Sequence, residues 1–242
     1  MIKNFCIACW LFSSVVFAQY NDSELYVTVL SQHVHSGKVD YARLRLDRRF
    51  SNYLFSLTEV NPDTIQNLNA RKAFWINVYN AYTLSVVRDH YPVKSIRAID
   101  TGLFGTSVWD KPYVHVGGKK YSLNDVEHKI LRPMNDPRIH FALVCAAKSC
   151  PVLRNEPYRA EKLDEQLNEA ARQFMNDPER NRVDHQAKAL YLSSIFKWYG
   201  TDFGKSTGDM VRYLLRYMDI NDTDRVVSYR VEYLDYDWSL NE

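Results

Sequence analysis

The sequence has little cysteine, little net charge and no long apolar run, and these absences exclude several classes of protein. Its 242 residues contain four cysteines and carry a formal net charge of +2. A nearly balanced charge without a clustered basic face gives no basis for nucleic-acid binding. A transmembrane helix needs about 20 consecutive apolar residues. No segment reaches that length, so no membrane span is expected in the mature chain.

The first residues have the pattern of a cleavable export signal. Lys3 precedes an apolar run over residues 5–17, and Ala18 is a small residue where signal peptidase cleaves. We therefore expect residues 1–18 to be a signal peptide and the protein to be exported, to the periplasm or beyond the cell. Residues 19–242 contain no repeat, low-complexity tract or linker, so one domain is expected there.

The spacing of apolar residues predicts helices throughout and strands mainly after the middle of the chain. Helices are expected over residues 23–36, 42–57, 70–91, 124–132, 163–174 and 209–218, with a short piece opening at 61–63. The 70–91 helix is apolar on most sides, which indicates a buried central helix. Ser122 and Asp125 have the spacing of a capping box at the start of the 124–132 helix.

Strands are expected at the remaining apolar or alternating segments. They cover residues 113–116 and 119–123, which form a hairpin around Gly117 and Gly118, and residues 139–145, 189–192 and 226–234. The order of elements predicts an α+β fold, in which N-terminal helices and a central buried helix pack on a mostly antiparallel sheet.

Two helical segments carry polar residues suited to a site. Asn77 and Asn80 lie on one side of the expected central helix, and buried amides need definite hydrogen-bond partners. They either orient a catalytic group or tie the helix to a neighbouring loop, and we favour the second interpretation. On the 124–132 helix, Glu127 precedes His128, whose ordinary pKa suits a general base. A histidine satisfied within the core is the alternative.

A third segment, residues 140–151, brings together His140, Cys145 and Cys150. A nucleophilic thiolate needs a positive neighbour, which Lys148, His128 or His140 could supply. In an oxidising compartment the two cysteines would instead form one disulfide, which their spacing allows. Both alternatives stay open at this point. Two cysteines without further convergent ligands do not predict a metal site, and no cofactor is indicated.

At these segments the sequence resembles an uncharacterised family, domain of unknown function 547. The resemblance rests on residues 74–81, on 127–132, on 141–151, and on shorter matches at Leu192, 198–199, 202–203 and 236–238, so it covers nearly all of the mature chain. The family often has glycine after the first cysteine, where this chain has Ala146. If that position requires a positive φ, the alanine strains the loop.

The family is similar, at the level of fold analogy, to the papain and transglutaminase group of thiol enzymes. The thiol, histidine and buried polar residues of the three segments motivate the hypothesis of a thiol-dependent hydrolase or acyl transferase acting on peptide or envelope material. Cys145 or Cys150 would be the nucleophile, and His128, or else His140, the base. Asn77 or Glu127 would orient that base, and backbone N–H groups of residues 146–149 would stabilise an oxyanion. One departure is that the central helix contains no cysteine.

The rival hypothesis is a non-catalytic envelope protein that binds a peptide or glycan in an aromatic cleft. Its wall residues would be Trp75, Trp109, Trp198 and Tyr199, with a Cys145–Cys150 disulfide as a staple. Core packing is the alternative for each of these aromatic side chains. The partner expected under either hypothesis is a peptide, a protein or a glycan.

Overall fold

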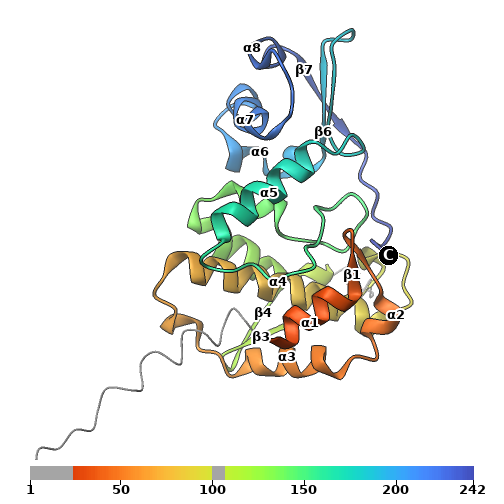
Figure 1. The fold of residues 1–242 in the computed structure, drawn as a ribbon, viewed down its shortest axis with the longest axis vertical. Coiled ribbons are helices and arrows are strands. Elements are labelled where there is room, and N and C mark those ends of the chain that lie inside the picture. Colours follow the sequence, from red (N-terminus) through yellow and green to blue (C-terminus); the bar gives the residue numbers. More distant parts are fainter. Residues whose placement is uncertain (1–23, 100–106) are drawn as a thin grey trace, which may run out of the picture.

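The computed structural model describes residues 24–99 and 107–242, so the expected signal peptide at residues 1–18 lies outside the described chain. The fold is α+β, as predicted, with many helices and small sheets (Figure 1). The α-helices are α1 (Glu24–His33), α2 (Tyr41–Leu44), α3 (Arg48–Thr58), α4 (Leu68–His90), α5 (Leu163–Met175), α6 (Ile195–Phe203), α7 (Thr207–Leu214) and α8 (Thr223–Val226).

Shorter helical turns and strands complete the chain. The turns are η1 (Pro62–Thr64), η2 (Ile96–Ala98), η3 (Val108–Asp110), η4 (Asp125–Leu131), η5 (Arg132–Met134), η6 (Pro137–Phe141) and η7 (Leu215–Tyr217). The strands are β1 (Val34–His35), β2 (Lys38–Val39), β3 (Val114–Val116), β4 (Lys119–Tyr121), β5 (Arg182–Asp184), β6 (Ala189–Ser193) and β7 (Arg230–Leu234).

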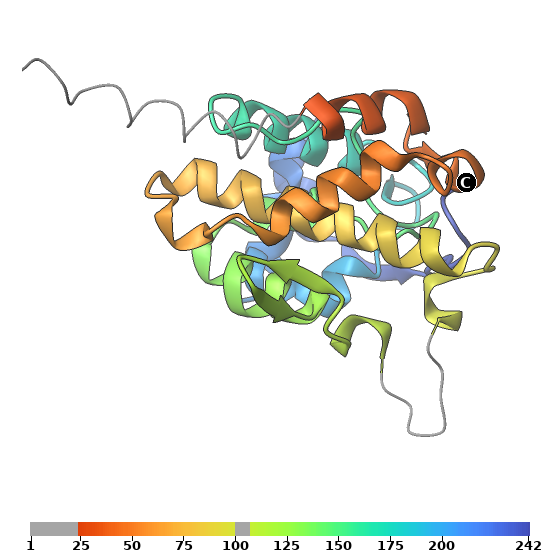
Figure 2. The same cartoon turned by 90° about the horizontal axis from the view of Figure 1, so that it is seen from below.

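Helix α4 is the centre of the larger core, as its composition predicted. Every residue from Lys72 to Val87 is buried, and the helix lies between α1 to α3 on one side and the β3–β4 hairpin on the other (Figure 2). The Asn67 side chain accepts from the Ala70 N–H and caps the first turn. The buried ammonium of Lys72 is paired with Asp136 at 2.7 Å. Because α4 is enclosed on all sides, polar groups on it must bond to neighbouring segments.

A second, smaller core lies in the C-terminal half. Its sheet has the order β5-β6-β7, with β5 antiparallel and β7 parallel to the central β6. The two hairpins β1–β2 and β3–β4 are antiparallel, so antiparallel pairing predominates while the last strand is an exception. Helices α5, α6 and α7 pack with this sheet in the upper part of Figure 1.

Two boundaries differ from the predictions, the first because of local capping. The expected 42–57 helix is interrupted, since the Asp47 side chain accepts from the Arg49 N–H and starts a new helix, α3. The expected 226–234 strand begins only at Arg230, after the short helix α8. The capping box is confirmed, because the Asp125 N–H donates to Ser122 Oγ at 3.0 Å and the Ser122 N–H donates to Asp125 Oδ2 at 2.9 Å.

The strand expected over residues 139–145 is wrong. Residues 137–141 form the turn η6, whose first N–H groups are capped by Asp136, and the following residues are irregular. The segment is buried, as an apolar run should be, but its backbone bonds to a side chain of α4 rather than to a neighbouring strand. Asn80 donates to the Ala142 carbonyl at 2.9 Å and accepts from the Val144 N–H at 2.9 Å.

The end of the chain returns to its beginning. After β7, residues 236–241 run beside the 146–149 loop, where the Lys148 N–H donates to the Ser239 carbonyl at 2.9 Å. Asn241 then reaches the N-terminal elements, because its side chain accepts from Tyr41 Oη at 2.9 Å and its carbonyl accepts from the Val39 N–H at 2.8 Å. The C-terminus accordingly lies beside β1 and α2 in Figure 1.

Candidate functional site

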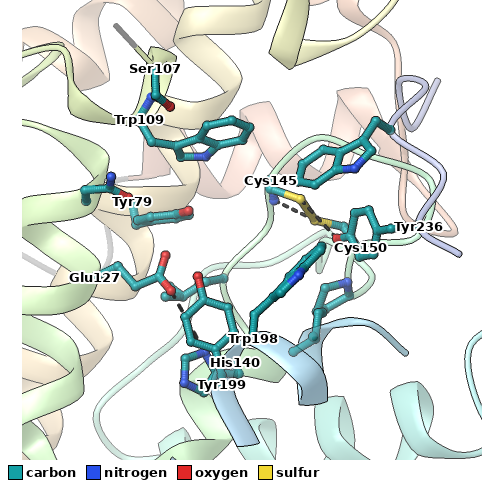
Figure 3. Close-up of a pocket in the computed structure, with 15 residues that line it drawn as sticks. Tyr79, Ser107, Trp109, Glu127, His140, Cys145, Cys150, Trp198, Tyr199 and Tyr236 are labelled. Atoms are coloured by element: carbon teal, nitrogen blue, oxygen red, sulfur yellow. Dashed lines mark hydrogen bonds and ion pairs between the residues drawn. A yellow bond between two sulfur atoms is a disulfide. The ribbon is translucent and has the colours of Figure 1, made fainter. Parts of the chain in front are cut away.

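A cavity of about 240 Å³ lies where the two cores meet. Its walls come from α4, η3, η4, η6, the loop after η6, α6 and the C-terminal segment, so residues far apart in the sequence converge there (Figure 3). The lining residues are Tyr79, Ser107, Trp109, Asn124, Glu127, His140, Leu143, Cys145, Cys150, Pro151, Ile195, Trp198, Tyr199, Tyr236 and Trp238. The cavity is the strongest candidate for a functional site among the described residues.

Cys145 and Cys150 form a disulfide in the wall of this cavity. The Asn80 bonds fix the backbone up to Val144 and thereby place Cys145 at the cavity. The Cys145 N–H donates to Cys150 Sγ at 2.7 Å, and the Tyr236 hydroxyl lies 3.2 Å from Cys145 Sγ. Of the two possibilities left open by the sequence, the structure contains the disulfide. The sulfur atoms are therefore bonded to each other and not free as thiols.

Ala146 has a left-handed backbone, with φ of 60°. The conformation is one that glycine adopts freely and alanine does not, because the Cβ atom crowds the following carbonyl. The Asn241 N–H donates to the Ala146 carbonyl at 3.2 Å, and Ala147 pairs with Leu240 in an isolated bridge. Contacts with the C-terminal segment thus hold the strained turn between the two cysteines, as the departure from glycine suggested.

His140 is buried and both of its ring nitrogens face carboxylates. Nε2 lies 2.8 Å from Asp202 Oδ2, and Nδ1 lies 4.0 Å from Glu127 Oε1. Burial lowers the pKa of His140, although the bond to Asp202 opposes this effect. The ring stacks on Tyr199 with a centroid separation of 4.2 Å. His140 is therefore a neutral ring at pH 7, with Nε2–H donating to Asp202.

Asp202 is shared between His140 and Arg132. The Arg132 guanidinium donates to both carboxylate oxygens, at 2.7 and 2.6 Å. Burial alone would raise the pKa of Asp202, but the hydrogen bonds from Arg132 and His140 outweigh it and lower that pKa. This bidentate pair holds the Arg132 guanidinium at Asp202, and neither residue lines the cavity.

Glu127 points into the cavity from η4 and has an exposed fraction of 6%. Two phenols, Tyr79 from α4 and Tyr199 from α6, lie against its carboxylate. Burial raises the pKa of both phenols, and the neighbouring Glu127 raises it further. Both hydroxyls therefore stay protonated and act as hydrogen-bond donors to Glu127.

Aromatic side chains form the opposite wall. Trp238 lies at the centre of this group, with ring centroids 4.6 Å from Tyr236, 5.8 Å from Trp198 and 5.7 Å from Trp109. Trp198 remains 47% exposed although it is large and apolar. An exposed aromatic ring beside a cavity is typical of a surface that receives a ligand.

Three of the residues predicted for the site lie elsewhere. His128 is exposed and contacts Arg132 at 3.1 Å. Asn77 bonds to the backbone of Tyr158, donating to its carbonyl at 2.8 Å and accepting from its N–H at 2.9 Å. Trp75 is buried and packs edge-on to Tyr121. Asn77 therefore ties the helix to a neighbouring loop, as favoured, and the position of Trp75 agrees with core packing.

The cavity also contains residues that sequence reasoning missed as site residues. Tyr79 lies among the buried residues of α4, where nothing in the sequence distinguished it from core residues. Asp202, which bonds to His140 from outside the lining, was named only as part of the family resemblance. Tyr236 and Trp238 were noticed only as part of the family resemblance. Among the described residues no group of histidine, cysteine and carboxylate side chains could hold a metal ion. No helix of the described chain is long and apolar enough to cross a membrane.

The fold and the site define a mixed α+β protein with an aromatic cavity bordered by a disulfide. Residues 64–175 match the family described as "Protein of unknown function, DUF547". Over that segment the chain is similar to this family, as its motifs predicted. The segment includes α4, η4 and the disulfide, and therefore many of the residues that line the cavity. Neither a curated protein nor a solved structure matches the chain.

Proposed function

We propose that this protein is an exported binding protein that takes a side chain of a peptide into the aromatic cavity. The observation that carries the proposal is the convergence of Trp109, Trp198 and Trp238 on one cavity with a disulfide in its wall. Enclosed aromatic surface favours an apolar or stackable ligand group. The export pattern at residues 1–18 and the disulfide both favour an oxidising compartment outside the cytoplasm.

The chemistry of the sulfur atoms supports binding over thiol catalysis. A thiol enzyme needs a free thiolate next to a base, and here the two sulfurs are joined. Within the described residues neither His128 nor His140 hydrogen-bonds to a sulfur, because they contact Arg132 and Asp202 respectively.

The hydrogen-bonding groups of the lining favour a peptide side chain over a sugar ring. A sugar presents several hydroxyl groups, each of which needs a partner when it is buried. Several polar lining groups are already used within the protein. Ser107 Oγ accepts from the Trp109 N–H, Asn124 donates to Asp110, and His140 is bonded to Asp202. A peptide side chain with a single polar group needs fewer hydrogen-bond partners from the lining residues.

Tryptophan fluorescence of the full chain tests the proposal, since three tryptophans line the cavity. Titration with pools of short peptides should change the emission, and fragments of neutral glycans should not. Trp198→Ala should weaken peptide binding about 30-fold, because a central tryptophan contributes about 2 kcal/mol or more to binding. Trp75→Phe, a change at a tryptophan outside the cavity, is the control. Binding of glycans alone, or equal binding by the Trp198 variant, would refute the proposal.

A thiol-dependent hydrolase or acyl transferase is the second candidate. One specific observation favours it, namely that Cys145 and Glu127 line the same cavity, so a reduced Cys145 thiol would face bound ligand. A dithiol reductant should then produce hydrolysis of peptide esters that Cys145→Ser abolishes. Equal hydrolysis by the reduced wild type and the Cys145 variant would remove this candidate.

A further inference from the structure

The cavity holds a buried carboxyl group, that of Glu127, with no lysine or arginine paired to it in the described lining. Glu127 is 94% removed from solvent, given its exposed fraction of 6%, and its carboxylate faces the cavity (Figure 3). Among the described residues that line the cavity, no lysine or arginine is present. A buried charge is costly unless it is paired. A ligand that brings a positive charge would therefore recover a large part of this cost.

The described side chains that line the cavity around Glu127 carry no formal positive charge. His140 lies 4.0 Å away and is neutral, because burial lowers its pKa. Since Nε2–H donates to Asp202, the Nδ1 lone pair faces Glu127 and adds to the negative potential. The Tyr79 and Tyr199 hydroxyls donate hydrogen bonds to the carboxylate. The charge of Arg132 acts on Glu127 through space, but its guanidinium makes its bidentate hydrogen bonds to Asp202.

The aromatic wall suits a planar cation. Trp198 and Trp238 stack at 5.8 Å with an interplanar angle of 29°, and Trp198 leaves about half of its surface open. The protein already stacks one guanidinium on this wall, since Arg97 Cζ lies 5.0 Å from the Trp238 ring centroid. The negative face of an indole ring attracts a cation, most strongly when water is excluded.

We propose that the cavity binds the guanidinium group of an arginine side chain, paired with Glu127 and stacked on Trp198. This inference rests on the proposed function, and it specifies which peptides are bound. A guanidinium is planar, weakly hydrated and able to pair with a carboxylate through two N–H donors while it stacks on an aromatic face. A lysine ammonium is strongly hydrated and needs three acceptors, which a wall of indole rings does not provide.

Calorimetry on the full chain tests the inference with three capped tripeptides that differ only at the central residue: arginine, citrulline or lysine. Citrulline has the shape of arginine without its charge. The arginine peptide should bind at least tenfold more tightly than the citrulline or the lysine peptide. Glu127→Gln should weaken the arginine peptide at least tenfold. Glu165→Gln, the same change at an exposed position of α5, should bind the arginine peptide as the wild type does.

The outcomes separate the inference from the function on which it rests. Equal affinity for arginine and citrulline, or unchanged arginine binding in the Glu127 variant, overturns the inference. Lysine binding as tight as arginine overturns the assignment of a guanidinium. If peptides with apolar central residues bind while arginine brings no gain, the inference fails and peptide binding stands. If no peptide binds, the proposed function itself fails. Near-UV circular dichroism checks that the Glu127 variant is folded. If the variant is not folded, the affinities of the wild-type protein for the arginine, citrulline and lysine peptides decide whether the inference holds.

Discussion

Replacing Ala146 with glycine should cost far less stability than the same change at another buried alanine. Ala146 has φ of 60°, and it is 1% exposed. Ala142 is also 1% exposed, and its φ of −111° lies in the region that alanine prefers. The two positions are four residues apart and equally buried, so they form a matched pair that differs mainly in backbone conformation.

The magnitudes follow from three contributions. Losing a buried methyl group costs about 0.8 kcal/mol, and the greater freedom of glycine in the unfolded chain costs about 0.4–1 kcal/mol. Ala142→Gly should therefore destabilise the protein by about 1.2–1.8 kcal/mol. At Ala146 the left-handed conformation costs alanine about 1–2 kcal/mol, which glycine relieves. Ala146→Gly should consequently leave the free energy of unfolding within about 1 kcal/mol of the wild type.

Urea unfolding of the two variants and the wild type measures this difference. Ala146→Gly should be more stable than Ala142→Gly by about 1–2 kcal/mol, which for a chain of this size is a gap in Tm of about 2–8 °C. The slope of the free energy against urea concentration should be the same for all three proteins. Equal losses at the two positions would show that the turn between the cysteines is not strained by alanine.

Three further changes probe the surroundings of the cavity. Cys145→Ala with Cys150→Ala should lower the free energy of unfolding by about 2 kcal/mol for a five-residue separation, and alkylation without reductant should leave the wild type unmodified. Asn80→Ala should cost about 2–6 kcal/mol, since it leaves two buried backbone groups unbonded; a loss below 1 kcal/mol would contradict this. Burial lowers the pKa of His140, so the unfolded state binds the proton first and stability should fall as pH drops below about 6.5. His140→Asn should flatten that decline measured by urea unfolding, and an unchanged pH profile would count against it.

The elements predicted correctly from the sequence are those whose formation depends on residues close together in the chain. The central helix was expected between Asn69 and Pro92, and α4 covers Leu68–His90, because its apolar residues occur on every side. The hairpin around Gly117 was also predicted correctly, because a turn with two glycines is a local signal and both glycines there have positive φ. The strand at 139–145 failed because a short apolar run indicates burial without specifying the backbone. The sequence did contain a contrary signal, Asp136 before Pro137, which starts η6.

The site was only partly predictable because it is assembled from distant segments. Cys145, Cys150, Glu127 and His140 were proposed from sequence and do line the cavity. His128 was proposed as the base, but it is exposed while its neighbour Glu127 lines the cavity. The turn η4 is a π-helix, and its wider period changes which residues face inward. No pattern within the sequence pairs His140 with Asp202, which is 62 positions away.

The contacts of the C-terminal segment determine when the cavity can form. The last wall residues, Tyr236 and Trp238, are synthesised about ninety residues after the cysteines, and the Tyr236 hydroxyl lies 3.2 Å from Cys145 Sγ. Asn241 then bonds to Tyr41, 200 positions earlier in the chain. Closing loops of this length costs entropy that must be recovered by many contacts made together. While the chain is still being synthesised, the cysteines thus lack this last part of their wall, and their thiols stay more accessible to oxidants and to other thiols until the final segment closes the site.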